Sequence, residues 1–236
     1  MAAFLGFVGG QILGSVLVGG FAAIVASWQG RDLLDSGVVD DLTQEILVPS
    51  VLVGFITGVV VMVALSLVLA RRELRSREVT GAAWVAGSVV HRWVGLLVGL
   101  VIGLGSLTIP VWMFPPSEAI EPGPLAEMAA TPGFPRVAWL LMALVLAPLS
   151  EELLFRGVLL GGLTRSFGRV TGGLLVTVLF VALHVLEVFQ YPPALVGITV
   201  MALAALWLRL RTSAVGPAVA AHFAYNSVIS IAVLMA

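Results

Sequence analysis

Long apolar runs separated by short polar segments dominate the chain. Residues 4–28 contain no ionisable side chain, and a run of about 20 apolar residues can cross a bilayer as a helix. The same pattern predicts about seven spans in all. They cover residues 4–28, 46–70, 93–114, 137–163, 172–189, 194–208 and 214–236. Residues 79–90 are apolar but short, and they either lie at the membrane interface or lengthen the third span.

The composition excludes a water-soluble domain. Hydrophobic residues make up 60% of the 236 residues and charged residues only 11%, well below the roughly 25% of soluble proteins. We therefore predict an all-α, polytopic transmembrane helical bundle that forms a single integral membrane domain over residues 1–236, with the lipid bilayer as its partner. A net charge of −1 excludes a nucleic-acid partner, and the lack of cysteine excludes disulfides and thiolate sites.

The arginines predict the orientation in the membrane, because basic residues in short loops stay on the cytoplasmic side. One set of alternate loops holds most of them: Arg71, Arg72, Arg75, Arg77, Arg92, Arg165, Arg169, Arg209 and Arg211. The opposite loops hold only Arg31 and Arg136 and are acidic. The N-terminus is therefore predicted to be cytoplasmic. The small size and the lysine-free use of arginine favour a bacterial plasma membrane.

Three charged residues lie within six positions of the fourth span, where each charge costs about 2.5 to 3.5 kcal/mol. Glu152 precedes Arg156 by four residues, the favourable order for an ion pair along one helix face. We expect this pair to be structural. Glu151 lies about 100° around the helix and has no basic residue three or four positions away, which leaves its carboxylate for function. Pro148 is expected to kink this helix and admit water.

Two histidines lie in other apolar spans, each with a companion four residues away. Phe180 precedes His184, so its ring can fix the imidazole, and Asn226 follows His222 on the same helix face. With Glu151, these residues predict a catalytic pocket. A carboxylate and an imidazole can hold and deprotonate a water, and a histidine with an amide can stabilise the oxyanion formed when that water attacks an amide carbonyl.

These residues resemble three ordered motifs of the CPBP intramembrane proteases. This family includes type II CAAX prenyl proteases and bacterial proteins linked to bacteriocin processing and self-immunity. The sequence Glu151-Glu152-Leu153-Leu154-Phe155-Arg156 is similar to the first motif, Phe180 with His184 to the second, and His222 with Asn226 to the third. The resemblance covers about residues 140–230, which would be the CPBP-like catalytic core.

The resemblance implies an intramembrane endopeptidase that hydrolyses a peptide bond near the cytoplasmic membrane face. Glu151 and His184 would activate the water, and His222 and Asn226 would stabilise the oxyanion. The substrate would be a peptide or protein, with or without a lipid group. The family is often described as metallo-endopeptidases, so zinc held by Glu151, His184 and His222 is an alternative. We favour a reaction that requires no cofactor, because the chain has no compact zinc-binding spacing.

A non-catalytic protein is the alternative from another class. It would be a membrane immunity or scaffold protein, or a proton-coupled carrier that uses the buried carboxylate as its proton site. The sequence favours the protease, because every motif residue is present and no duplicated halves are evident.

Overall fold

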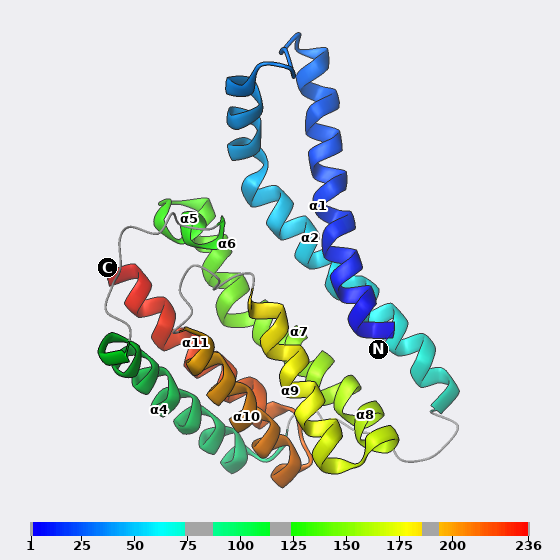
Figure 1. The fold of residues 1–236 in the computed structure, drawn as a ribbon, viewed down its shortest axis with the longest axis vertical. Coiled ribbons are helices and arrows are strands. Elements are labelled where there is room, and N and C mark those ends of the chain that lie inside the picture. The colour runs from blue at the N-terminus through cyan, green and yellow to red at the C-terminus, as the bar shows by residue number, and fades with distance from the viewer. Residues whose placement is uncertain (1, 74–86, 114–123, 186–193, 236) are drawn as a thin grey trace. The chain divides into compact units, whose positions relative to one another are not determined.

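The computed structural model describes residues 2–73, 87–113, 124–185 and 194–235, and every element in these ranges is a helix (Figure 1). The elements are α1 (Ala2–Trp28), α2 (Ser36–Glu73), α4 (Val89–Met113), α5 (Pro124–Ala130), α6 (Phe134–Leu141), η1 (Met142–Leu146), α7 (Ala147–Glu152), η2 (Leu153–Leu159), α8 (Leu160–Phe167), α9 (Arg169–Val185), α10 (Ala194–Thr212) and α11 (Gly216–Met235). The all-α prediction is confirmed.

Six helical stretches in the described residues are long and apolar enough to cross a membrane. They are Ala2–Trp28, Ser36–Leu65, Val89–Thr108, Phe134–Phe167, Ala194–Thr212 and Gly216–Met235. The predicted span at 172–189 overlaps the shorter apolar helix α9, and residues 186–189 lie outside the described ranges. The chain is therefore a polytopic helical membrane protein. Val89 and Val90 begin α4, so this part of the ambiguous 79–90 segment lengthens the third span, while residues 79–86 lie outside the described ranges.

Two elements differ from the sequence-based expectation. Helix α2 begins at Ser36, well before the predicted start at Ile46, because Asp35 Oδ1 accepts the Gly37 amide at 2.8 Å and caps the helix. Helix α5 lies between the predicted spans 93–114 and 137–163, where no helix was expected. Arg136 closes that helix by donating to two of its last carbonyls, Ala129 O at 2.8 Å and Ala130 O at 2.7 Å.

Contacts between Cα atoms divide the chain into two compact units, Met1–Arg75 and Ser76–Ala236. The expectation of a single membrane domain stays a prediction. In the first unit α1 packs on α2 through glycines: a Cβ at Gly14 would lie 2.7 Å from the Gly54 Cα, so only hydrogen allows this approach. Ser15 Oγ donates to Ser50 O at 3.1 Å beside this contact.

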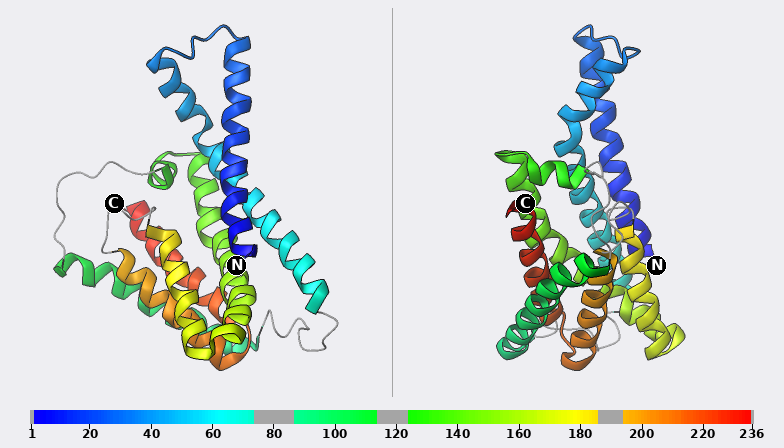
Figure 2. Two further views of the ribbon diagram at one scale, coloured as in Figure 1. Left: turned by 45° about the vertical axis from the view of Figure 1, so that its right-hand side comes forward. Right: turned by 60° about the vertical axis from the view of Figure 1, so that its left-hand side comes forward.

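In the second unit α4 lies along α11 and α10 (Figure 2). The glycines Gly95, Gly99 and Gly103 face α11, and a Cβ on Gly99 would collide with the Ala221 carbonyl. Their spacing of four residues places them on one face of α4 and allows this close helix packing. Helix α11 carries His222 and Asn226, so α4 sets the position of one wall of the candidate site.

Candidate active site

The fourth span, Phe134–Phe167, contains two π-helical turns, and the two glutamates lie between them. In η1 the Ala147 amide donates to Met142 O, five residues back. Pro148 has no amide hydrogen, so neither residue supplies a donor to Ala143 O. Asn226 from α11 supplies it instead, with Nδ2 at 2.7 Å from that oxygen. The irregularity expected at Pro148 is therefore a π-turn. The carbonyl of Ala143 in this turn has no backbone donor, and it accepts a hydrogen bond from the side chain of Asn226 instead.

Glu152 is the centre of a fully buried network. Its Oε1 accepts a hydrogen bond from Arg156 Nη1 at 3.1 Å, and both side chains are 0% exposed. The predicted ion pair is confirmed. The same oxygen lies 3.1 Å from His222 Nδ1, a contact between helices that the sequence does not predict. Arg156 Nη2 also donates to Ala202 O at 2.8 Å, which joins the network to α10.

Glu151 of α7 and His184 of α9 lie close together. Glu151 Oε2 lies 3.7 Å from His184 Nε2, and the two side chains are only 12% and 15% exposed. This carboxylate oxygen is buried and makes no hydrogen bond to the described residues. His184 Nδ1 donates to Phe180 O at 2.9 Å, because a carbonyl can only accept. The neutral ring therefore carries its lone pair on Nε2, the nitrogen that faces Glu151.

Phe180 touches most of the polar groups of the site. Its ring stacks on His184 with centroids 4.6 Å apart and meets His222 edge-on at 5.8 Å. The guanidinium carbon of Arg156 lies 4.5 Å from the centroid of the same ring, a cation–π contact. The stacking of Phe180 on His184, which the sequence led us to expect, is thus one of several contacts that this ring makes. The same ring contacts both imidazoles.

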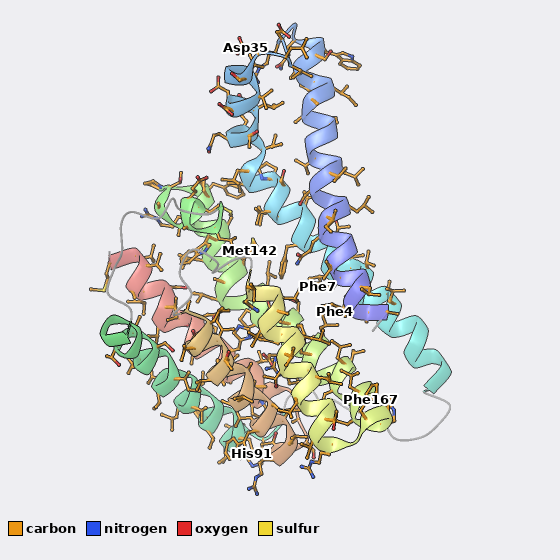
Figure 3. All side chains as sticks on the ribbon, viewed as in Figure 1. Phe4, Phe7, Asp35, His91, Met142 and Phe167 are labelled. Atoms are coloured by element: carbon orange, nitrogen blue, oxygen red, sulfur yellow. The ribbon has the colours of Figure 1, made fainter. Side chains whose placement is uncertain are left out.

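The structure brings together residues from three helices that are distant in the sequence: Glu151, Glu152 and Arg156 from the span between Met142 and Phe167 (Figure 3), Phe180 and His184 from α9, and His222 with Asn226 from α11. Sequence reasoning missed the carbonyl of Ala143. The only signal was Pro148, and it is indirect: in a regular helix a proline there leaves Leu144 O without a donor, and it is the π-turn that moves the gap to Ala143.

The zinc alternative does not match the arrangement of the side chains. Two imidazoles and a carboxylate suit zinc chemically, but within the described ranges no group of three or more histidine, aspartate or glutamate side chains could hold a metal ion. His222 directs Nδ1 at Glu152. We therefore derive no step through a metal, and both the zinc alternative and the cofactor-free reaction stay predictions.

A family model described as type II CAAX prenyl endopeptidase, Rce1-like, matches residues 133–228. The match contains every site residue named above, and it agrees with the resemblance of their motifs to the CPBP family of CAAX proteases. No curated protein and no solved structure matches the chain. The similarity supports the expectation of an intramembrane endopeptidase, and the apolar helices of the described residues support an integral membrane protein.

Proposed function

We propose that the chain hydrolyses a peptide bond near the cytoplasmic membrane face with a water activated by Glu151 and His184. The observation that carries this proposal is the 3.7 Å between Glu151 Oε2 and His184 Nε2. Two acceptors of the same water can be up to about 5.6 Å apart, which is twice the usual hydrogen-bond length of about 2.8 Å. The observed distance is below this limit, so one water can donate to both acceptors. As its proton moves to one of them, the water oxygen attacks the substrate carbonyl carbon.

His222 stabilises the oxyanion in its doubly protonated form. Glu152 Oε1 accepts a hydrogen bond from Arg156 Nη1, and it accepts a second one from His222 Nδ1 when that nitrogen carries the hydrogen. Only the imidazolium then has a second N–H, on Nε2, to offer to the oxyanion. In this form the positive charges of Arg156 and His222 balance the negative charges of Glu151 and Glu152. The cluster of these four side chains is then neutral as a whole.

Asn226 can serve the oxyanion while it holds the Ala143 carbonyl. Its amide nitrogen has two hydrogens, and Ala143 O takes one of them at 2.7 Å. The second is available for the developing negative charge. When the tetrahedral intermediate collapses, the carbon–nitrogen bond breaks and the proton taken from water passes to the leaving amine.

Three finer features belong to the same proposal. The reaction uses no metal, which zinc content and chelator sensitivity of the purified protein would test. The substrate is a peptide or protein, with or without a lipid group. The chain is oriented with a cytoplasmic N-terminus in a bacterial plasma membrane.

The substitution Glu151→Gln tests the proposal, because glutamine keeps the size of the side chain but cannot take a proton. We expect cleavage to fall by at least about 100-fold with unchanged accumulation of the protein. The assay compares peptides that accumulate in cells producing the variant with those in wild type. Asp40→Asn, at an exposed position on α2, is the control. Normal cleavage in Glu151→Gln would refute the catalytic role, and loss of the protein itself would favour a structural, non-catalytic one.

A further inference from the structure

A cavity lies between α8, α9 and α10, and its lining residues are not those of the candidate active site. Its volume is about 300 Å³, within the usual range for small-molecule sites. The residues that line it are Leu160, Gly161, Thr164, Arg169, Arg209 and Leu210. Two of these six residues are arginines, and none of these described lining residues is acidic. The two charged residues among these six lining residues are therefore both positive.

The arginines come from different helices. Arg169 is the first residue of α9, and its Nη2 donates to Leu210 O at 3.4 Å. Arg209 lies on α10, and its Nε donates to Arg156 O at 3.1 Å. The bond from Arg169 uses one of the five N–H donors of its guanidinium group. A third arginine is near, because Arg165 Nη1 lies 3.9 Å from the point where a Cβ on Gly161 would be.

We propose that this cavity binds a phosphate-bearing anion, either the headgroup of an anionic lipid or free phosphate. Arginine forks match the geometry of phosphate oxygens. Basic pockets between membrane helices on the cytoplasmic side bind anionic headgroups, and the sequence places these arginines on that side. Gly161 contributes by its small size, because a larger side chain would fill the cavity.

This inference goes beyond peptide hydrolysis and does not rest on it. The two sites are nevertheless joined by contacts. Arg209 binds the backbone carbonyl of Arg156, and the Arg156 side chain binds Glu152, which in turn contacts His222. An anion on Arg209 would therefore touch a residue that holds the buried network in place.

The test measures binding of phosphatidylglycerol, phosphatidylcholine and inorganic phosphate to the full-length protein purified in detergent, by native mass spectrometry and by ligand-dependent melting. Arg169→Gln removes one cavity charge, and Arg211→Gln removes an exposed charge on α10 that does not line the cavity. We expect phosphatidylglycerol to bind at least about fivefold more weakly to Arg169→Gln, and within about twofold of wild type to Arg211→Gln. Phosphatidylcholine, which carries no net charge, should bind weakly to all three proteins.

A second variant fills the cavity without changing any charge. Gly161→Leu places a side chain in the cavity at a helical position where a Cβ meets only the far end of Arg165, so the fold should be kept. We expect it to weaken phosphatidylglycerol binding as Arg169→Gln does. Competition by inorganic phosphate would identify the free anion as a ligand, and lack of competition would identify the lipid. Equal losses in Arg169→Gln and Arg211→Gln, or undiminished binding to Gly161→Leu, would overturn the proposal.

Discussion

At the scale of single residues, two adjacent glutamates have different surroundings. Glu152 is completely buried, and one of its oxygens meets both Arg156 and His222. Glu151 is slightly exposed and faces His184. A buried charge is tolerated when it is paired and hydrogen-bonded, and it is costly when one partner is removed. The two positions should therefore respond to substitution in different ways.

Glu152→Ala is expected to destabilise the protein strongly, by about 3 to 5 kcal/mol, because the Arg156 guanidinium would remain buried without its counter-charge. Melting of the purified protein in detergent and its accumulation in membranes measure this effect. Glu151→Gln is the matched control and should melt close to wild type. If both variants melt alike, the assignment of Glu152 to stability and Glu151 to chemistry is wrong.

The sequence predicts pairs within one helix well, because residues four apart share a helix face. Glu152 with Arg156 and the stacking of Phe180 on His184 follow from this rule. The contact between Glu152 and His222 does not, since it depends on how two helices are aligned along their length. That alignment arises from packing, which no spacing within one segment encodes.

At the scale of elements, the two π-turns of the fourth span have a common property. In η1 the carbonyl of Ala143 is bound by a side chain from α11, and in η2 the carbonyl of Arg156 is bound by Arg209 from α10. A π-turn widens the helix and redirects carbonyls that a regular helix would use internally. The widened turns thus tie the span that carries the glutamates to two other helices.

A double-mutant cycle tests the link between Pro148 and Asn226. Asn226→Ala leaves the partly buried Ala143 carbonyl without its side-chain donor and should cost about 1 to 3 kcal/mol. Pro148→Ala restores an amide hydrogen that can reach that carbonyl or allow a regular helix. The same Asn226→Ala change should therefore cost at least about 0.5 kcal/mol less in a Pro148→Ala background, measured as the stability of all four proteins. Strict additivity would show that the two residues act independently.

Helix α4 packs closely against α11, which carries two of the site residues, although α4 itself carries none of the motifs. Gly99→Ala forces a methyl group against the Ala221 carbonyl, next to His222, and should cost about 1 to 3 kcal/mol. Gly105→Ala lies on the same helix with nothing within 4 Å of the new Cβ, so it is the control and should be near neutral. Thermal melting separates the two. A harmless Gly99→Ala would mean that α4 and α11 are less tightly packed than described.

At the scale of the whole molecule, every site residue lies in the unit Ser76–Ala236, and the unit Met1–Arg75 contributes the α1–α2 hairpin. Hydropathy predicted the spans nearly completely, because the bilayer imposes length and apolar composition on each crossing. It misjudged the start of α2, since a helix can continue into water once an aspartate caps it.

Orientation is directly testable, because the chain has no native cysteine. Ser36→Cys at the start of α2 should react with a membrane-impermeant maleimide in intact cells, and Ser166→Cys, near the end of α8, should react only after permeabilisation. Both serines are exposed, so accessibility within the protein is matched. The reverse pattern of labelling would invert the proposed orientation and place the arginine-lined cavity on the outer face.

The π-turn at Met142–Leu146 also limits how this protein can be altered. A π-turn holds one residue more than the α-helical turn it replaces, so deleting a single residue there would give a regular helix. Since each residue accounts for about 100° of rotation, everything before the deletion would turn by that angle relative to Glu151 and Glu152. Insertions, deletions and grafts between related chains are therefore better placed in the connections between spans than in this segment, where the residue count fixes the helical phase.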